Sequence, residues 1–100
     1  MKPLIKIETD KRIVTEGEVI EVRWECPGAS QASLNIYNGF KSTTLTIEPR
    51  GSKRFRVYRS KHGARFTLSA QIEGRTFRHA TAVKVLRKDG LLNRILRMFR

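Results

Sequence analysis

Cysteine, acidic residues and long apolar runs are all scarce in this chain of 100 residues. Its one cysteine, Cys26, cannot form an internal disulfide, so nothing in the cysteine content points to an oxidising compartment. The opening residues, MKPLIKIETD, lack the apolar segment of a signal peptide, and no apolar run reaches membrane-spanning length. We therefore expect a cytoplasmic protein, or an exported one if the chain is a module excised from a longer protein.

Side chains suited to catalysis or metal binding are equally sparse. Cys26, His62 and His79 are the only thiol and imidazole groups, and their spacing matches no common metal-ligand pattern. Cys26 also falls on the apolar side of an alternating stretch, where a thiol is usually inert. The glycines stand at expected turns and form no phosphate-binding loop. The sequence predicts a non-enzymatic protein without a cofactor, and no small-molecule substrate is evident.

The sequence does contain clear alternation of apolar and polar residues, first between residues 17 and 36, GEVIEVRWECPGASQASLNI. Successive side chains of a β-strand point to opposite faces, so this pattern predicts two strands that are buried on one side. Pro27-Gly28 separates the two strands, and Trp24 is the largest predicted core residue. The predicted buried positions are Ile20, Val22, Trp24, Cys26, Ala32, Leu34 and Ile36.

Turn signals recur about every ten residues along the rest of the chain. Asn38-Gly39 predicts a hairpin, since both residues tolerate positive φ. Residues 64–72 alternate most clearly, and Glu73-Gly74 connects them to a last strand over 76–86. A short first strand is expected at Leu4–Ile7, which Ile13-Val14 would continue. Seven or eight strands with no helix before residue 89 predict an all-β sandwich or barrel.

The stretches EGEVIEVRWECPGASQASLNI and RFTLSAQIEGRTFRHATAVKV resemble the bacterial immunoglobulin-like repeat and its closing hairpin, over about residues 4–86. The resemblance implies an immunoglobulin-like antiparallel β-sandwich of about seven strands. Such domains are mostly adhesive, spacer or scaffolding modules. This chain departs from them at Phe66, where they often carry a tyrosine, so we expect no tyrosine-corner hydrogen bond. It also lacks the paired cysteines of antibody-type domains.

Positive charge is concentrated in the second part of the chain. Residues 1–40 carry five Lys and Arg against six Asp and Glu, whereas residues 41–100 carry sixteen against three, so the halves contribute −1 and +13 to the net charge of +12. Pro49-Arg50-Gly51-Ser52 signals a turn, and a strand is expected over Lys53–Arg59. We expect Arg54 and Arg56 of that strand to face Glu21 and Glu25, respectively, on the neighbouring strand. Nine other cations are candidate contacts for a protein partner or a polyanion: Arg65, Arg75, Arg78, Lys84, Arg87, Lys88, Arg94, Arg97 and Arg100.

The final stretch, DGLLNRILRMFR over residues 89–100, has the apolar spacing of a short basic amphipathic helix. A helix this short needs a docking surface to be stable in water. That surface could be its own sandwich (residues 1–88), a partner groove or second copy, or an anionic membrane. The predicted docking face consists of Leu92, Ile95, Leu96 and Phe99.

Two classes of function follow. The first is a non-catalytic protein-interaction or scaffolding module, whose charged faces and exposed sheet edges engage another protein or a second copy. The alternative is a polyanion-binding protein that contacts nucleic acid or an anionic membrane through its basic strands and the C-terminal helix. The charge asymmetry favours the second class, whereas the scarcity of aromatic side chains on the predicted exposed faces favours the first.

Overall fold

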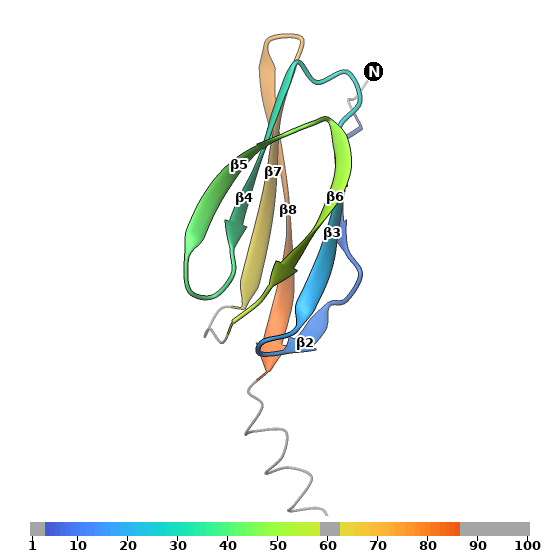
Figure 1. The fold of residues 1–100 in the computed structure, drawn as a ribbon. Coiled ribbons are helices and arrows are strands. Elements are labelled where there is room, and N and C mark those ends of the chain that lie inside the picture. Colours follow the sequence, from blue (N-terminus) through green and yellow to red (C-terminus); the bar gives the residue numbers. More distant parts are fainter. Residues whose placement is uncertain (1–3, 59–62, 87–100) are drawn as a thin grey trace, which may run out of the picture.

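The computed structural model describes residues 4–58 and 63–86, which form eight β-strands in two sheets (Figure 1). One sheet has three strands in the order β1-β3-β6, and the other has five in the order β2-β8-β7-β4-β5. The strands are β1 Lys6–Thr9, β2 Ile13–Thr15, β3 Val19–Glu25, β4 Gln31–Tyr37, β5 Ser42–Ile47, β6 Arg50–Arg56, β7 Ala64–Ile72 and β8 Arg75–Leu86.

The three-stranded sheet is built around β3, which pairs antiparallel with β1 on one side and β6 on the other. Its alternation is the one expected from the sequence, with exposed or half-exposed residues between Ile20, Val22 and Trp24. Trp24 lies between Ile7 and Gly51 in the register of the sheet. The prediction that Trp24 belongs to the core is confirmed, because only 7% of this residue is exposed.

The five-stranded sheet contains two antiparallel hairpins, β4–β5 and β7–β8, joined through the β4–β7 pair. β2 adds to β8 in parallel, with Val14 beside Val85. Ile13-Val14 therefore does not continue the first strand, as the sequence suggested, but lies in the opposite sheet. The change of sheet occurs near Asp10, whose backbone N–H and carboxylate both bond to the backbone of Glu21. This split is one reason that the described residues form eight strands.

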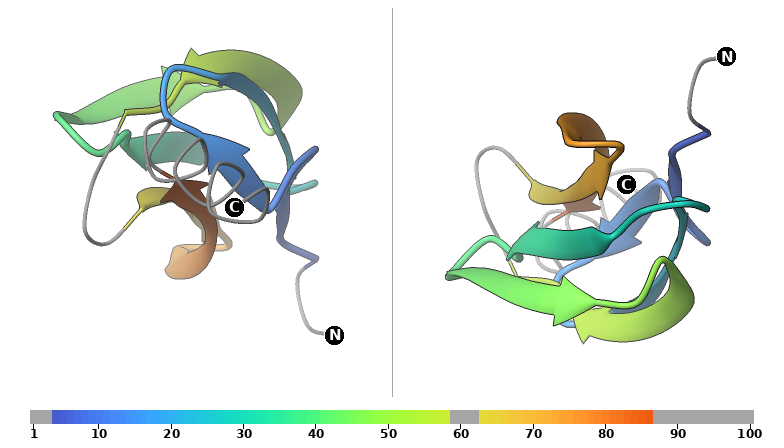
Figure 2. Two further views of the ribbon diagram at one scale, coloured as in Figure 1. Left: turned by 90° about the horizontal axis from the view of Figure 1, so that it is seen from below. Right: turned by 90° about the horizontal axis from the view of Figure 1, so that it is seen from above.

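The two sheets lie face to face (Figure 2). Apolar side chains from both sheets form one core cluster between them. The Phe55 and Phe66 rings, from opposite sheets, lie with their centroids 5.7 Å apart. The largest fully buried side chains are Phe66, Ile20, Leu34, Leu68, Val22, Val57, Val83 and Cys26. All seven positions predicted to be buried between residues 17 and 36 belong to this core.

The predicted fold class is contradicted and needs correction. Instead of about seven strands followed by a helix, the described residues form eight strands and contain no helix. The helix prediction concerned residues 89–100, which lie outside the described residues, and it rested on apolar spacing, which alone does not stabilise so short a helix. Within residues 4–58 and 63–86, no helix is long and apolar enough to cross a membrane.

Candidate interaction surfaces

The outer face of the three-stranded sheet carries side chains of both charges, arranged by the strand register. Lys6 and Arg50 lie on either side of Glu25, and Arg23 lies opposite Glu8. We call this surface the charged face; its charged members are Lys6, Glu8, Glu21, Arg23, Glu25, Arg50, Arg54 and Arg56. Its five cations are thus interleaved with three carboxylates, which partly cancel their field.

Three ion pairs are formed on the charged face. Lys6 Nζ lies 3.2 Å from Glu8 Oε1, and the Glu21 carboxylate receives Arg23 Nε at 3.0 Å and Arg54 Nε at 4.0 Å. The predicted pairing of Arg54 with Glu21 is confirmed. All five side chains are well exposed to water, at 30% to 79%, so each pair contributes well under about 1 kcal/mol.

The predicted pairing of Arg56 with Glu25 is wrong. Arg56 lies opposite Val19, and its guanidinium donates to the Gly17 carbonyl at 2.9 Å. Glu25 lies opposite Arg50, because β6 begins three residues earlier than the expected strand at Lys53. The Arg50-Gly51-Ser52 segment that signalled a turn is instead part of β6.

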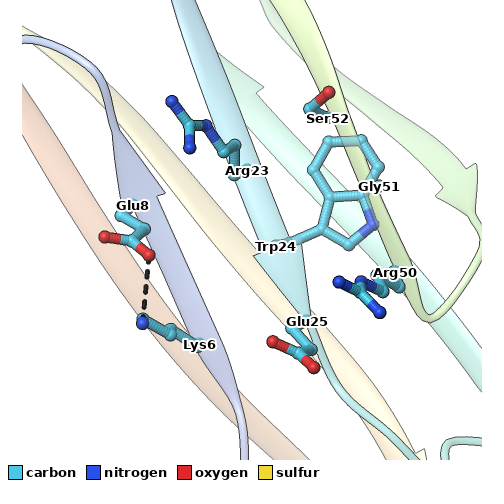
Figure 3. Close-up of a pocket in the computed structure, with 8 residues that line it drawn as sticks. All are labelled: Lys6, Glu8, Arg23, Trp24, Glu25, Arg50, Gly51 and Ser52. Atoms are coloured by element: carbon cyan, nitrogen blue, oxygen red, sulfur yellow. Dashed lines mark ion pairs between the residues drawn. The ribbon is translucent and has the colours of Figure 1, made fainter.

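A hollow of about 330 Å³ indents the charged face around Trp24 (Figure 3). The indole Nε1 donates to the Glu48 carbonyl at 2.8 Å, which fixes the ring at the side of β6. Gly51 leaves room for the ring, since a Cβ at that position would lie 3.0 Å from Trp24 Cζ2. The hollow is lined by Lys6, Glu8, Arg23, Trp24, Glu25, Arg50, Gly51 and Ser52. Because both cations and carboxylates line the hollow, it favours neither an anionic nor a cationic ligand.

The outer face of the five-stranded sheet is neutral over most of its width. Hydroxyl and amide side chains face outward in register, and Asn35 Nδ2 donates to Thr44 Oγ1 at 2.9 Å and to Ser42 Oγ at 3.3 Å. We call this surface the hydroxyl face; it comprises Gln31, Ser33, Asn35, Ser42, Thr44, Thr46, Thr67, Ser69, Gln71 and Thr76. Part of it, between Ser30 and Thr76, is hollowed by about 370 Å³.

Three of the predicted contact cations, Arg65, Arg78 and Lys84, border the hydroxyl face on β7 and β8. Arg65 lies opposite Ala82, which places it diagonally across from Lys84, at about 7–8 Å between Cα atoms. Arg78 lies four residues along β8 from Ala82, about 13 Å away. No outward-facing residue of the five strands is a carboxylate, so these cations lack the compensation found on the charged face.

The other predicted contacts do not join this group within the described residues. Arg75 lies opposite Ile72, on the other face of the sheet from Arg78. The remaining predicted residues lie outside the described residues: Arg87, Lys88, Arg94, Arg97 and Arg100, and the docking face Leu92, Ile95, Leu96 and Phe99.

Sequence reasoning did not single out the outer edge of β5. No described strand pairs with this side of β5, which is the last strand of its sheet. Asn38 N–H donates to the Lys41 carbonyl, and hydrogen-bonded pairs alternate along an antiparallel ladder. The alternation directs the backbone groups of Thr43, Leu45 and Ile47 toward β4. The N–H and C=O groups of Ser42, Thr44 and Thr46 therefore point away from the sheet.

Two other open edges, those of β6 and of part of β8, carry charged side chains, which discourage pairing with another strand. β2, at the opposite end of the five-stranded sheet, is also uncharged, but it is only three residues long. β6 has the sequence RGSKRFR. Its Lys53 lies on the side of the strand that faces the core, opposite Val22, and Lys53 Nζ is 6.0 Å from the centre of the Phe55 ring. The open part of β8 includes Arg75, Arg78 and His79. In contrast, β5 reads STTLTI and has no charge and no proline. That uncharged run is the sequence signal that could have identified the edge.

An exposed aromatic pair lies next to the start of β5. Phe40 is 84% exposed and Tyr58 is 43% exposed, and their ring centroids are 6.4 Å apart in an edge-to-face arrangement. Tyr58 N–H donates to the Asn38 carbonyl at 2.8 Å, which holds the segment after β6 against the β4–β5 turn. The pair therefore places exposed aromatic surface next to the start of β5.

Cys26 is fully buried, and its thiol donates to the Pro49 carbonyl at 3.3 Å. Burial raises the pKa of this thiol, because desolvation disfavours the thiolate. The side chain is therefore a poor nucleophile, as expected from its position in the sequence. Among residues 4–58 and 63–86, no group of three or more His, Cys, Asp or Glu side chains could hold a metal ion.

No protein-family model matches this chain, and no curated protein matches its sequence. Solved structures do match it. One is a crystal structure described as that of an engineered protein, with a TM-score of 0.61 and 14% identity over 85% of this chain. This chain matches 20% of that protein's length. At such low identity the likeness shows the fold alone, and the resemblance to bacterial immunoglobulin-like repeats stays a prediction.

Proposed function

We propose that this domain is a non-catalytic protein-interaction module that binds an extended segment of a partner along the outer edge of β5. The observation that carries the proposal is a row of outward-facing backbone donors and acceptors on a strand without charge or proline. An extended peptide can add to such an edge as a further strand, with main-chain hydrogen bonds supplying much of the affinity.

The geometry of β5 favours strand addition for a second reason. Asn35 holds the side chains of Ser42 and Thr44 on the outer face, so these two hydroxyls are fixed away from the edge. On the inner side, Leu45 and Ile47 are only half-buried. An added strand would cover them further and gain about 25 cal/mol for each Å² of apolar surface removed from water.

Selection from a library of random peptides, with the folded domain as the target, tests this proposal. Thr46→Pro is the counter-target, because proline removes an outward N–H while the β4–β5 hydrogen bonds remain. Thr46→Val keeps that N–H and is the matched control. We expect enriched peptides to bind the parent and Thr46→Val but not Thr46→Pro. Failure to enrich any peptide, or equal binding to Thr46→Pro, would contradict the proposal.

A second candidate function, polyanion binding, is favoured by the uncompensated cations Arg65, Arg78 and Lys84 beside the hydroxyl face. Phosphates bound there would release counterions, so the affinity should fall steeply as salt rises. A salt titration of binding to generic duplex DNA measures this dependence. Absence of binding at low salt would remove nucleic acid as a ligand.

A further inference from the structure

We propose that the segment paired with β5 is an acidic strand of a partner protein in which apolar and acidic residues alternate. This inference rests on the proposed function and adds the chemistry of the partner. Three features of the described residues carry it: the two faces of β5, the charges along the same flank of the molecule, and the net charge of the chain.

The two faces of β5 determine the alternation. Side chains directly opposite each other in neighbouring strands lie on the same face of a sheet. Those of the added strand on the inner side would lie beside Leu45 and Ile47, which are partly buried against the core. Those on the outer side would lie beside the hydroxyls of Thr44 and Thr46. Apolar residues therefore suit the inner side of the added strand, and polar or charged residues suit its outer side.

Charge along the flank selects acidic residues for the polar positions. β5 and β6 follow one another along one flank of the molecule (Figure 2). Between residues 41 and 58 the only carboxylate is Glu48. Three of the exposed cations in that range, Arg50, Arg54 and Arg56, belong to the charged face, where Glu21 and Glu25 partly compensate them. The other two, Lys41 and Lys53, lie outside that face and have no such compensation among the described strands. Lys41 directly precedes β5 and Glu48 directly follows it, whereas Lys53 lies on the open edge of β6. The net charge of these three residues is positive, so an acidic segment beside β5 is attracted more than a basic one.

The net charge argues against a second copy as the occupant. Each chain carries +12, so edge-to-edge pairing of two copies would bring two strongly positive surfaces together. An acidic partner reverses the sign of that interaction. Among occupants of the β5 edge, an acidic extended segment is the one that both the backbone and the charge favour.

Binding of matched synthetic peptides to the full chain tests the inference. The first peptide alternates valine with glutamate, the second alternates valine with lysine, and the third is the glutamate peptide with proline in place of its central valine. Affinity is measured by titration, and contact with β5 by amide chemical-shift changes at Ser42, Thr44 and Thr46. We expect the glutamate peptide to bind at least about tenfold more tightly than the lysine peptide, and the proline peptide to lose binding.

Substitutions in the protein separate charge from backbone. Lys41→Gln with Lys53→Gln should reduce the preference for glutamate over lysine by severalfold, whereas the control pair Arg23→Gln with Arg54→Gln, on the charged face, should leave it unchanged. Thr46→Pro should abolish binding of the glutamate peptide, and Thr46→Val should not.

The outcomes distinguish this inference from the proposed function. Equal binding of the glutamate and lysine peptides with shifts at β5 would overturn the acidic preference and leave edge binding intact. Shifts confined to β6, or binding of the proline peptide as tight as that of its parent, would reduce the effect to general charge attraction and overturn the inference. If none of the peptides bound, both proposals would fail. A dimer in sedimentation that Thr46→Pro dissociates would identify a second copy as the occupant.

Discussion

The two sheets of this domain handle positive charge in different ways. On the three-stranded sheet, carboxylates are interleaved with the cations, and Glu21 alone receives both Arg23 and Arg54. On the outer face of the five-stranded sheet, the cations Arg65 and Lys84 stand among hydroxyl and amide groups, with no outward carboxylate on the five strands. The two faces therefore differ in how far carboxylates compensate their cations, and the number of cations alone does not identify a binding surface.

The edges of the two sheets differ in charge as well: the edge strand β6 of the smaller sheet is charged, whereas the edge strand β5 of the larger sheet is not. β6 is the edge strand of the three-stranded sheet. Its arginines, and Lys53 on its core-facing side, discourage pairing with another strand. β5, at the edge of the larger sheet, has no charged side chain. Natural sheets commonly protect their edges against pairing, so an unprotected edge beside a protected one is the feature that requires a functional explanation.

Among the substitutions that test the difference between the two sheets, the largest change in stability is expected from removing Trp24, the large core residue of the three-stranded sheet. Trp24→Ala should lower the free energy of unfolding by about 3–5 kcal/mol, because the residue is 7% exposed and its ring fills space beside Gly51. Trp24→Phe, which loses the bond to the Glu48 carbonyl but keeps an aromatic ring, should cost less. Urea denaturation measures both. A Trp24→Ala protein as stable as its parent would show that the three-stranded sheet does not depend on this residue.

Gly51→Ala should have the next largest effect, about 1–3 kcal/mol of destabilisation. Its Cβ would lie 3.0 Å from Trp24 Cζ2 and 3.3 Å from Trp24 Cε2, so the indole or β6 must shift. Ser52→Ala, at the next position on the exposed side of β6, is the control and should change stability by less than about 0.5 kcal/mol. The same denaturation curves decide between them, and equal stabilities would mean that the ring adjusts at no cost.

Removal of the uncompensated cations tests the contrast between the faces directly. If polyanions bind beside the hydroxyl face, changing Arg65, Arg78 and Lys84 to glutamine should reduce the salt slope of duplex-DNA binding by as much as about 2.7, near 0.9 for each lost phosphate contact. The matched triple change of Arg23, Arg54 and Arg56 on the charged face should reduce it less. Equal reductions would show that the carboxylates do not distinguish the two faces.

Breaking an ion pair on the charged face should have the smallest effect. Glu21→Gln removes the partner of Arg23 and Arg54, yet these pairs are exposed and spaced at 3.0 and 4.0 Å. We expect a loss well below about 1 kcal/mol, which decreases further at high salt. Thermal unfolding at low and high salt measures it. A loss of several kcal/mol would mean that this charge arrangement supports the fold and not merely its surface.

Strands with strict alternation could be predicted from the sequence, because one buried face imposes a period of two. β3, β4 and β7 follow this pattern at every core position. His79 shows where the pattern fails: it lies opposite the buried Leu68 yet is exposed. Parity assigns a residue to a face, but burial also requires something to cover that part of the face.

Turn geometry was harder to predict than turn position. Asn38-Gly39 does lie between two paired strands, but only Gly39 has positive φ, and the Asn38 side chain instead accepts the N–H groups of Phe40 and Lys41. At Glu73-Gly74, in contrast, both residues have positive φ. Glutamate adopts positive φ less readily than asparagine, so the sequence did not indicate this conformation. The short connection between β7 and β8 imposes that conformation on Glu73.

The candidate site could be predicted only in part. Exposure of Arg65, Arg78 and Lys84 follows from the charge of the side chains, but their common face depends on the register between β7 and β8. The open edge of β5 depends on the order of strands in the sheet, which is set by contacts between residues far apart in the sequence. Local patterns do not contain that information.

The parallel pairing of β2 with β8 determines how the domain would respond to mechanical tension. A pulling force applied between residues 4 and 86 draws β2 and β8 in opposite directions along their common axis, so it loads their contacts in shear. Bonds from Lys84 N–H to the Arg12 carbonyl and from Glu16 N–H to the Leu86 carbonyl lie at the two ends of the pair. Under shear these bonds share the load and break together, whereas a hairpin pulled from its open end separates one bond at a time. The β1–β3 pair, which precedes β2 in the chain, carries the same load, so both pairs resist the opening of the sandwich.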